Sequence, residues 1–147
     1  VLSAVEAAGF EDGLYIASDR YGMPWMSGGG CLITRDFLRM GLLFARKGKG
    51  VGNRRVGSSS FLNQTLKNHG PKYMNLTNNR YLYYSNSTMV SGNVIGHSGY
   101  GGQYLAINLK NGNVAAFFSV LETKSATQEN YKTDMINMLI NLVNYKY

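Results

Sequence analysis

Apolar residues recur at helical spacing between residues 34 and 48. Three of them follow an i, i+3, i+7 pattern and the others widen the stripe; the set is Phe37, Leu38, Met40, Leu42, Phe44 and Ala45. This spacing predicts a core-facing helix. We expect it to begin at Thr34, whose hydroxyl can cap it, and to stop at Gly48. Asp36 would lie in the first turn, where the helix dipole favours a negative charge.

Two shorter helices are also indicated. The Ala-rich residues 1–8 read as the end of an amphipathic helix closed by Gly9. A second helix is expected from about Ser60 to Asn68, capped by the serine cluster at 58–60 and ended by Gly70-Pro71. Between the first helix and the helix at Thr34, residues 13–30 are dense in turn residues and predict a long loop.

The carboxyl-terminal region predicts a longer helix, from about Gln128 to Asn144. Its apolar positions follow i, i+4, i+7, i+8 spacing and form the face Tyr131, Met135, Met138, Leu139, Leu142 and Val143. We expect this face to lie across a sheet.

The second half of the chain before this helix is rich in Tyr and β-branched residues. The expected strands cover residues 81–90, 94–99, 103–109 and 114–121. Turns at Ser91-Gly92-Asn93 and at Asn111-Gly112 separate apolar runs, and an Asn-Gly pair in that position is a strong hairpin signal. The sequence therefore predicts an α+β fold, an antiparallel sheet with packed helices.

Length, cysteine content and hydropathy narrow the classes of protein to which the chain can belong. The chain has 147 residues, the usual size of one domain, and its single cysteine excludes an internal disulfide framework. No apolar run approaches the ~18 residues that a membrane span needs, and no signal peptide opens the chain. Because the chain begins at Val1 instead of Met, we expect an upstream segment to precede it.

The net charge of +7 is concentrated in the middle of the chain, because no acidic residue lies between Asp36 and Glu122. Such a basic region is compatible with nucleic acid or an acidic partner. Since no nucleic-acid-binding motif accompanies the charge, we interpret it as a solvated basic face.

Several motifs occur in a characteristic order along the chain. Three glycines at 28–30 precede Thr34-Arg35-Asp36 at a helix start, and Gly96-His97-Ser98-Gly99 follows on a strand, before a hairpin and the final helix. In this order the chain resembles the carboxyl-terminal half of the serine β-lactamase-like hydrolases, the group of class C β-lactamases, D,D-peptidases, esterases and 6-aminohexanoate-dimer hydrolases. The resemblance implies one partial domain over residues 1–147, the carboxyl-terminal part of the β-lactamase/transpeptidase-like fold.

The resemblance also implies roles for four residues. His97, Ser98 and Gly99 match the family's Lys-Thr-Gly strand, which some members write as His-Thr-Gly or His-Ser-Gly. His97 would supply a proton or a positive field, and Ser98 would hydrogen-bond a substrate carboxylate or carbonyl. Gly99 would leave room beside the strand. The backbone N–H of Tyr100 would be an oxyanion-hole donor, and the substrate would lie along the strand edge.

The family's nucleophile is missing from this chain. No lysine has Ser or Thr three positions before it, so there is no Ser-x-x-Lys motif. Tyr73-Met74-Asn75 and Tyr84-Ser85-Asn86 fit the family's second motif but lie too close to His97, and we interpret both as chance matches. By the resemblance, the parent would cleave an amide, ester or lactam carbonyl through an acyl-enzyme, and this chain alone would be inactive.

The resemblance further implies partners and a location. The family's sheet places an amino-terminal strand beside residues 114–121, so we expect either a companion from the amino-terminal half of the same protein or a homo-oligomer. We expect no cofactor. A periplasmic or secreted location would follow if the parent behaves as the family does.

Two alternatives remain open at this point. The chain can be a non-catalytic binding module, either a degenerate family member or a basic nucleic-acid-binding surface. It can also be a cysteine hydrolase with Cys31 as nucleophile and His97 as base, although a lone cysteine beside Leu32 and Ile33 is usually buried and inert. His69 and His97, without a matching acid or thiol pair, make a weak metal site.

Overall fold

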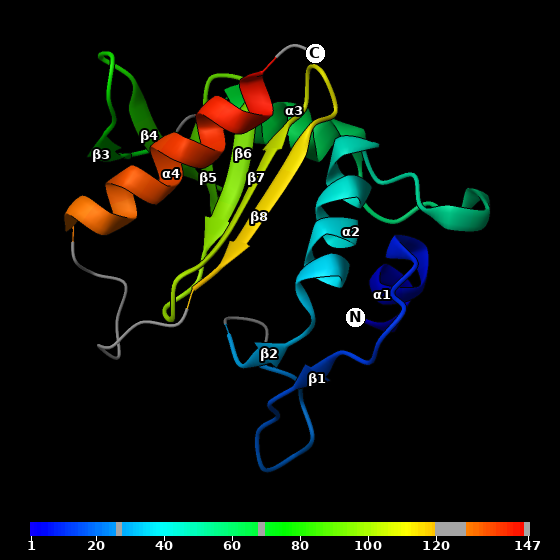
Figure 1. Cartoon of the computed structure of the whole chain (residues 1–147). Helices are drawn as coiled ribbons and strands as arrows, with labels where there is room; N and C mark the ends of the chain where they lie inside the picture. The colour runs from blue at the N-terminus through cyan, green and yellow to red at the C-terminus, as the bar shows by residue number, and fades with distance from the viewer. Residues whose placement is uncertain (26–27, 68–69, 120–128, 146–147) are drawn as a thin grey trace.

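The computed structural model of the chain describes residues 1–25, 28–67, 70–119 and 129–145. Within these ranges it contains a six-stranded antiparallel sheet and four α-helices (Figure 1). The prediction of an α+β fold with helices packed on an antiparallel sheet is confirmed. None of the helices in the described ranges is long and apolar enough to span a membrane.

The sheet is built from strands that follow one another along the chain. They are β3 (Lys72–Asn75), β4 (Tyr81–Ser85), β5 (Thr88–Ser91), β6 (Val94–Ser98), β7 (Gln103–Asn108) and β8 (Val114–Phe118). Each pairs antiparallel with the next, in the order β3-β4-β5-β6-β7-β8. The turns predicted at Ser91-Gly92-Asn93 and Asn111-Gly112 are confirmed, and Gly92 (φ 58°) and Gly112 (φ 82°) have the left-handed backbone that glycine adopts without strain.

The single strand expected over 81–90 was wrong, because the chain reverses in its middle. Asn86 (φ 49°) and Ser87 (φ 58°) both adopt left-handed backbone and join β4 to β5 by a two-residue turn. Strand β3, which was not predicted, pairs with β4. Strand β8 ends at Phe118, and residues 120 and 121 of the expected strand lie outside the described residues.

The predicted amino-terminal helices form close to their expected bounds. Helix α1 (Leu2–Ala8) is closed by Gly9 with φ 73°, as predicted. Helix α3 (Ser59–Lys67) is capped by Ser58, whose Oγ accepts hydrogen bonds from the N–H groups of Ser60 and Phe61. The remaining residue of the expected α3 segment, Asn68, lies outside the described residues.

Helix α2 (Thr34–Ala45) departs from the prediction at both ends. Its N-cap residue is Ile33, with no side-chain cap, so the predicted cap by the Thr34 hydroxyl was wrong. Thr34 is already the first helical residue and is therefore one position too late to cap it. The helix ends at Ala45, and the chain then turns through Lys47 (φ 54°) and Gly48 (φ 82°).

Helices cover both faces of the sheet (Figure 1). Helix α4 (Glu129–Asn144) packs on β7 and β8 from one side, and α2 packs on the same two strands from the other. On the α2 face, Val90, Ile95, Leu105 and Ile107 form a buried cluster with Leu62 of α3. The final helix therefore lies across the sheet, as predicted.

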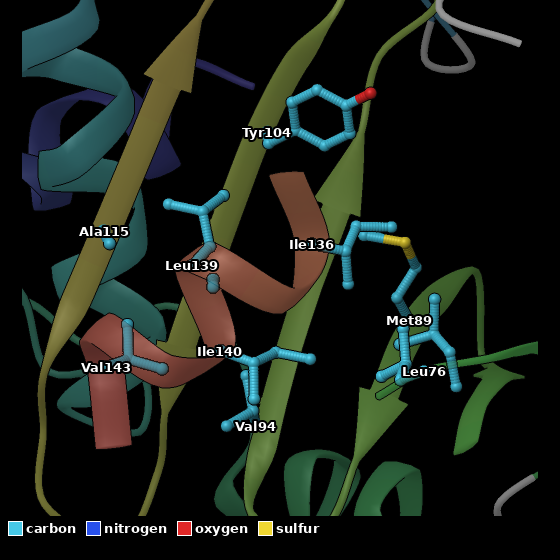
Figure 2. Packing of buried hydrophobic residues seen from close by; sticks show 11 residues of the cluster. Leu76, Met89, Val94, Tyr104, Ala115, Ile136, Leu139, Ile140 and Val143 are labelled. Carbon is cyan, nitrogen blue, oxygen red and sulfur yellow. The ribbon is translucent and has the colours of Figure 1, made fainter. Parts of the chain in front are cut away.

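The face that α4 buries differs from the predicted one. Met138 and Leu142 are exposed, whereas Ile136 and Ile140 are buried with Leu139 and Val143. Figure 2 shows these four side chains of α4 against Val94, Ala115 and other residues of the cluster. Apolar residues surround much of α4, so periodicity along the chain does not single out the stripe that meets the sheet.

The glycine-rich loop before α2 forms a small hairpin. Strand β1 (Tyr15–Ile16) pairs with β2 (Gly30–Cys31), and a short 3-10 helix, η1 (Val51–Asn53), follows α2. Among the three glycines at 28–30, Gly29 is the one whose geometry requires glycine. Its φ is 72°, and a Cβ there would lie 2.9 Å from the Cβ of Ala17.

Candidate functional site

The predicted site residues lie at the end of β6, where one edge of the strand is open. Strand β6 pairs with β7 along its full length, up to His97 opposite Leu105 and Ser98 opposite Tyr104. Its pairing with β5 stops at Gly96, opposite Met89. Within the described residues, the β5-side edge of His97 and Ser98 is therefore unpaired, and an extended segment can add there by backbone hydrogen bonds.

Strand geometry places the side chains of His97 and Ser98 on opposite faces of the sheet, because successive strand residues alternate. The His97 ring contacts Phe44 of α2, with ring centroids 6.4 Å apart. Ser98 belongs to the face of its partner Tyr104, which packs under α4. Only an occupant at the strand edge can therefore reach both side chains.

The imidazole of His97 is partly buried. Burial lowers its pKa below the ordinary value of 6.5, because the charged form loses hydration. At neutral pH the ring is therefore neutral, and it can accept a proton or a hydrogen bond.

Tyr100 lies in the turn that follows β6 and presents an unused backbone donor. The turn is closed by hydrogen bonds from Gly99 N–H to the Gln103 carbonyl (2.7 Å) and from Gly102 N–H to the Gly99 carbonyl (3.2 Å). The N–H of Tyr100 donates to no backbone acceptor in the described part of the chain, and its side chain is exposed. The structure thus places a free N–H two residues after the unpaired strand edge.

The space beside Gly99 holds the side chain of Gln103, which sequence reasoning did not single out. A Cβ on Gly99 would lie 2.4 Å from Oε1 of Gln103, and a Cβ on Gly101 would lie 2.7 Å from its Nε2. Gln103 therefore packs against the turn that carries Tyr100. The glycines on either side of Tyr100 were the available signal, because such glycines mark close approaches.

Position 96 also requires glycine, because the neighbouring strand leaves no space for a Cβ. A Cβ there would lie 2.2 Å from the carbonyl oxygen of Leu105, on the neighbouring strand. Glycine lets β6 and β7 approach closely just before the open edge begins.

The alternative nucleophile, Cys31, lies in β2 and is exposed, so the expectation that it is buried was wrong. No hydrogen bond joins it to His97 in the described ranges. Those ranges also hold no group of three His, Cys, Asp or Glu side chains that could bind a metal, and His69 lies outside them.

The two Tyr-x-Asn strings lie on other strands than His97: the first on β3, and the second at the end of β4 and in the turn to β5. The rings of Tyr73 and Tyr84 contact each other, with centroids 5.9 Å apart. Asn86 donates from Nδ2 to the hydroxyl of Thr65 on α3 at 3.0 Å. These contacts give Tyr73, Tyr84 and Asn86 structural roles.

Comparisons with known proteins add no relative from which a site could be transferred. No protein-family model, curated protein or solved structure matches the chain.

Proposed function

We propose that the chain is the carboxyl-terminal part of a serine β-lactamase-like hydrolase domain, which cleaves an amide, ester or lactam carbonyl through an acyl-enzyme. The observation that supports this best is the open edge of β6 at His97 and Ser98, followed by the free N–H of Tyr100. These are the positions that the resemblance to the family assigns to the substrate wall and the oxyanion hole.

In this proposal each group has a separate task. An extended substrate lies along the β6 edge and is held by backbone hydrogen bonds and the Ser98 hydroxyl. The N–H of Tyr100 donates to the oxyanion that develops on the attacked carbonyl. Burial keeps His97 neutral, which favours proton acceptance over a positive field.

The nucleophile comes from outside this chain, because none of its lysines is preceded by Ser or Thr at the third position. We propose that it is carried by an amino-terminal companion that completes the domain.

Two surfaces suit such a partner. Strand β8 is an edge of the sheet in the described residues. Tyr15, Tyr21 and Trp25, in the first part of the β1–β2 hairpin, are exposed and belong to residue types that dominate binding energy at interfaces.

An intact-mass measurement after treatment with a fluorophosphonate serine probe tests the proposal. We expect the 147-residue chain to remain unlabelled and a companion polypeptide with a Ser-x-x-Lys motif to carry the adduct. An adduct on this chain would place a nucleophile inside it and overturn the proposal. If the companion is present and nothing is labelled, the binding-module alternative replaces the hydrolase.

A pH profile of labelling tests the role of His97. In the complex with its companion, the labelling rate should be constant near neutral pH and fall as the pH drops below 6.5 and through the lowered pKa of His97. His97→Gln should slow labelling about 100-fold and abolish this limb of the profile. The matched control is His69→Gln, the chain's other histidine, which should leave both rate and profile unchanged. An unaltered profile in His97→Gln would remove His97 from the site.

A further inference from the structure

A polar groove separate from the β6 edge lies between the start of β4, the β5–β6 turn and the end of α4. Its volume is about 370 Å³, within the range of small-molecule sites. The lining side chains that matter here are Asn79, Arg80, Tyr81, Tyr83, Asn93 and Asn144. No acidic residue lines it.

Arg80 is held in a fixed orientation at this groove. Its Nε donates to the Thr77 carbonyl at 3.3 Å, and its Nη2 donates to Oδ1 of Asn141 at 3.1 Å and to Oδ1 of Asn137 at 3.4 Å. Asn137 is itself buried and is anchored through Nδ2 to the Thr133 carbonyl at 2.9 Å. The guanidinium is therefore positioned by one edge, while Nη1 makes no hydrogen bond within the described part of the chain.

The positive charge of Arg80 is not compensated. All the acceptors of its hydrogen bonds are neutral oxygens, and no carboxylate in the described ranges forms an ion pair with it. A second cation contacts one of the lining residues, since the Lys72 ammonium lies 3.8 Å from the centre of the Tyr81 ring. A fixed guanidinium with a free N–H edge suits an oxyanion, to which charge-assisted hydrogen bonds are strong.

The rest of the lining indicates what carries the oxyanion. Asn79 and Asn93 make no side-chain hydrogen bonds within the described residues, and an amide both donates to and accepts from hydroxyl groups. The rings of Tyr81 and Tyr83 supply apolar area beside these amides. We infer that this groove binds a small hydroxylated oxyanion, a sugar acid or a sugar phosphate, with its anionic group on Arg80 and its hydroxyls on the asparagine amides. This inference does not depend on the proposed hydrolase function.

Calorimetric titration of the 147-residue chain with glucuronate, glucose 6-phosphate, inorganic phosphate and glucose tests the inference. One or both of the two sugar anions should bind more tightly than inorganic phosphate, and glucose should bind weakly or not at all. Their relative affinities distinguish a carboxylate from a phosphate ligand. Arg80→Gln should weaken binding of the preferred sugar anion about tenfold or more.

Arg46→Gln is the matched control, because Arg46 is exposed at the end of α2, does not line the groove, and loses the same charge. If Arg80→Gln does not fold, Asn93→Ala and Asn79→Gly decide the question. Glycine suits position 79, where φ is 54°, and each variant should weaken binding while leaving the circular dichroism spectrum unchanged. Absence of binding, equal binding of inorganic phosphate, or an equal loss in Arg46→Gln would overturn the inference.

Discussion

Asp36 is a fully buried carboxylate that ties α2 to the segment after α1. Its two oxygens accept hydrogen bonds from the N–H groups of Glu11 (3.1 Å) and Asp12 (2.9 Å), and Arg39 donates to it at 2.7 Å. Burial alone raises the pKa of the Asp36 carboxyl, but these hydrogen bonds and the charge of Arg39 outweigh it, and the pKa is lowered. The ionised form therefore stabilises the fold.

Asp36→Asn should lower the free energy of unfolding by about 2–3 kcal/mol, because the amide cannot accept at both positions and carries no charge for Arg39. The stabilising effect of Asp36 is fully present above the unfolded-state pKa, near 3.8, and is lost as the pH falls through the lower folded-state pKa. Urea unfolding at neutral pH and under acidic conditions measures both effects. A variant as stable as the parent chain at neutral pH would contradict this account.

Tyr104 is also buried, but unlike Asp36 it has a polar group without a hydrogen-bond partner in the described residues. Its ring is almost fully enclosed, and Figure 2 shows its hydroxyl pointing away from the aliphatic side chains of α4. That hydroxyl has no hydrogen-bond partner among the described residues. A buried hydroxyl without a partner costs free energy.

Tyr104→Phe should therefore leave the free energy of unfolding unchanged or raise it by about 1 kcal/mol, since it keeps the ring and removes only the unpaired group. Thermal unfolding checks this. A loss of 1 kcal/mol or more would mean that the hydroxyl is hydrogen-bonded in solution.

Among the elements, α4 ends against the β7–β8 hairpin through asparagine side chains. The Val143 carbonyl accepts from Nδ2 of Asn111 at 3.0 Å and of Asn113 at 3.2 Å, and Asn113 also donates to the Tyr145 carbonyl at 3.2 Å. These bonds satisfy carbonyls that a helix end leaves without intrahelical partners. The hairpin thus caps the helix that covers the sheet.

The double variant Asn111→Ala/Asn113→Ala should lower the free energy of unfolding by about 1–2 kcal/mol, because the Val143 carbonyl loses two of its donors. Asn63→Ala is the matched control, since Asn63 is exposed on α3 and alanine favours a helix. Chemical unfolding should give a lower free energy of unfolding for the double variant than for Asn63→Ala. Equal effects would show that the asparagines do not act as a cap.

At the scale of the molecule, acidic and basic residues are unevenly matched. Two carboxylates of the amino-terminal segment form ion pairs: Glu6 pairs with Arg54 at 2.7 Å, and Glu11 pairs with Arg35 at 3.1 Å and with Arg39. The stretch between Asp36 and Glu122 contributes no carboxylate. Within the described residues, Arg39 and Arg54 are the basic residues of this stretch that pair with a carboxylate, so the others leave a positive surface. The sheet ends in strand β8, an edge strand in the described residues.

In size-exclusion chromatography the chain should elute as a dimer or larger species, or together with a companion polypeptide, because an open sheet edge and exposed aromatic side chains favour association. Multi-angle light scattering gives the mass directly. A clean monomer with no second polypeptide would count against the proposed partner.

Local pattern was sufficient for those parts of the fold that depend on near neighbours in the chain. The Ser58 cap and the Asn111-Gly112 turn act within a few residues, and each formed as expected. The apolar spacing after Thr34 correctly predicted a helix there, but not its cap or its end at Ala45. Long-range packing set the rest. The burial of Ile136 and Ile140 instead of Met138 and Leu142 depends on where the sheet meets α4. The partners of Asp36 lie 24 and 25 residues away, and the open edge at His97 exists because β5 pairs with β6 only as far as Gly96. Such contacts are chosen by the surfaces that the whole chain brings together, and no window of the sequence contains them.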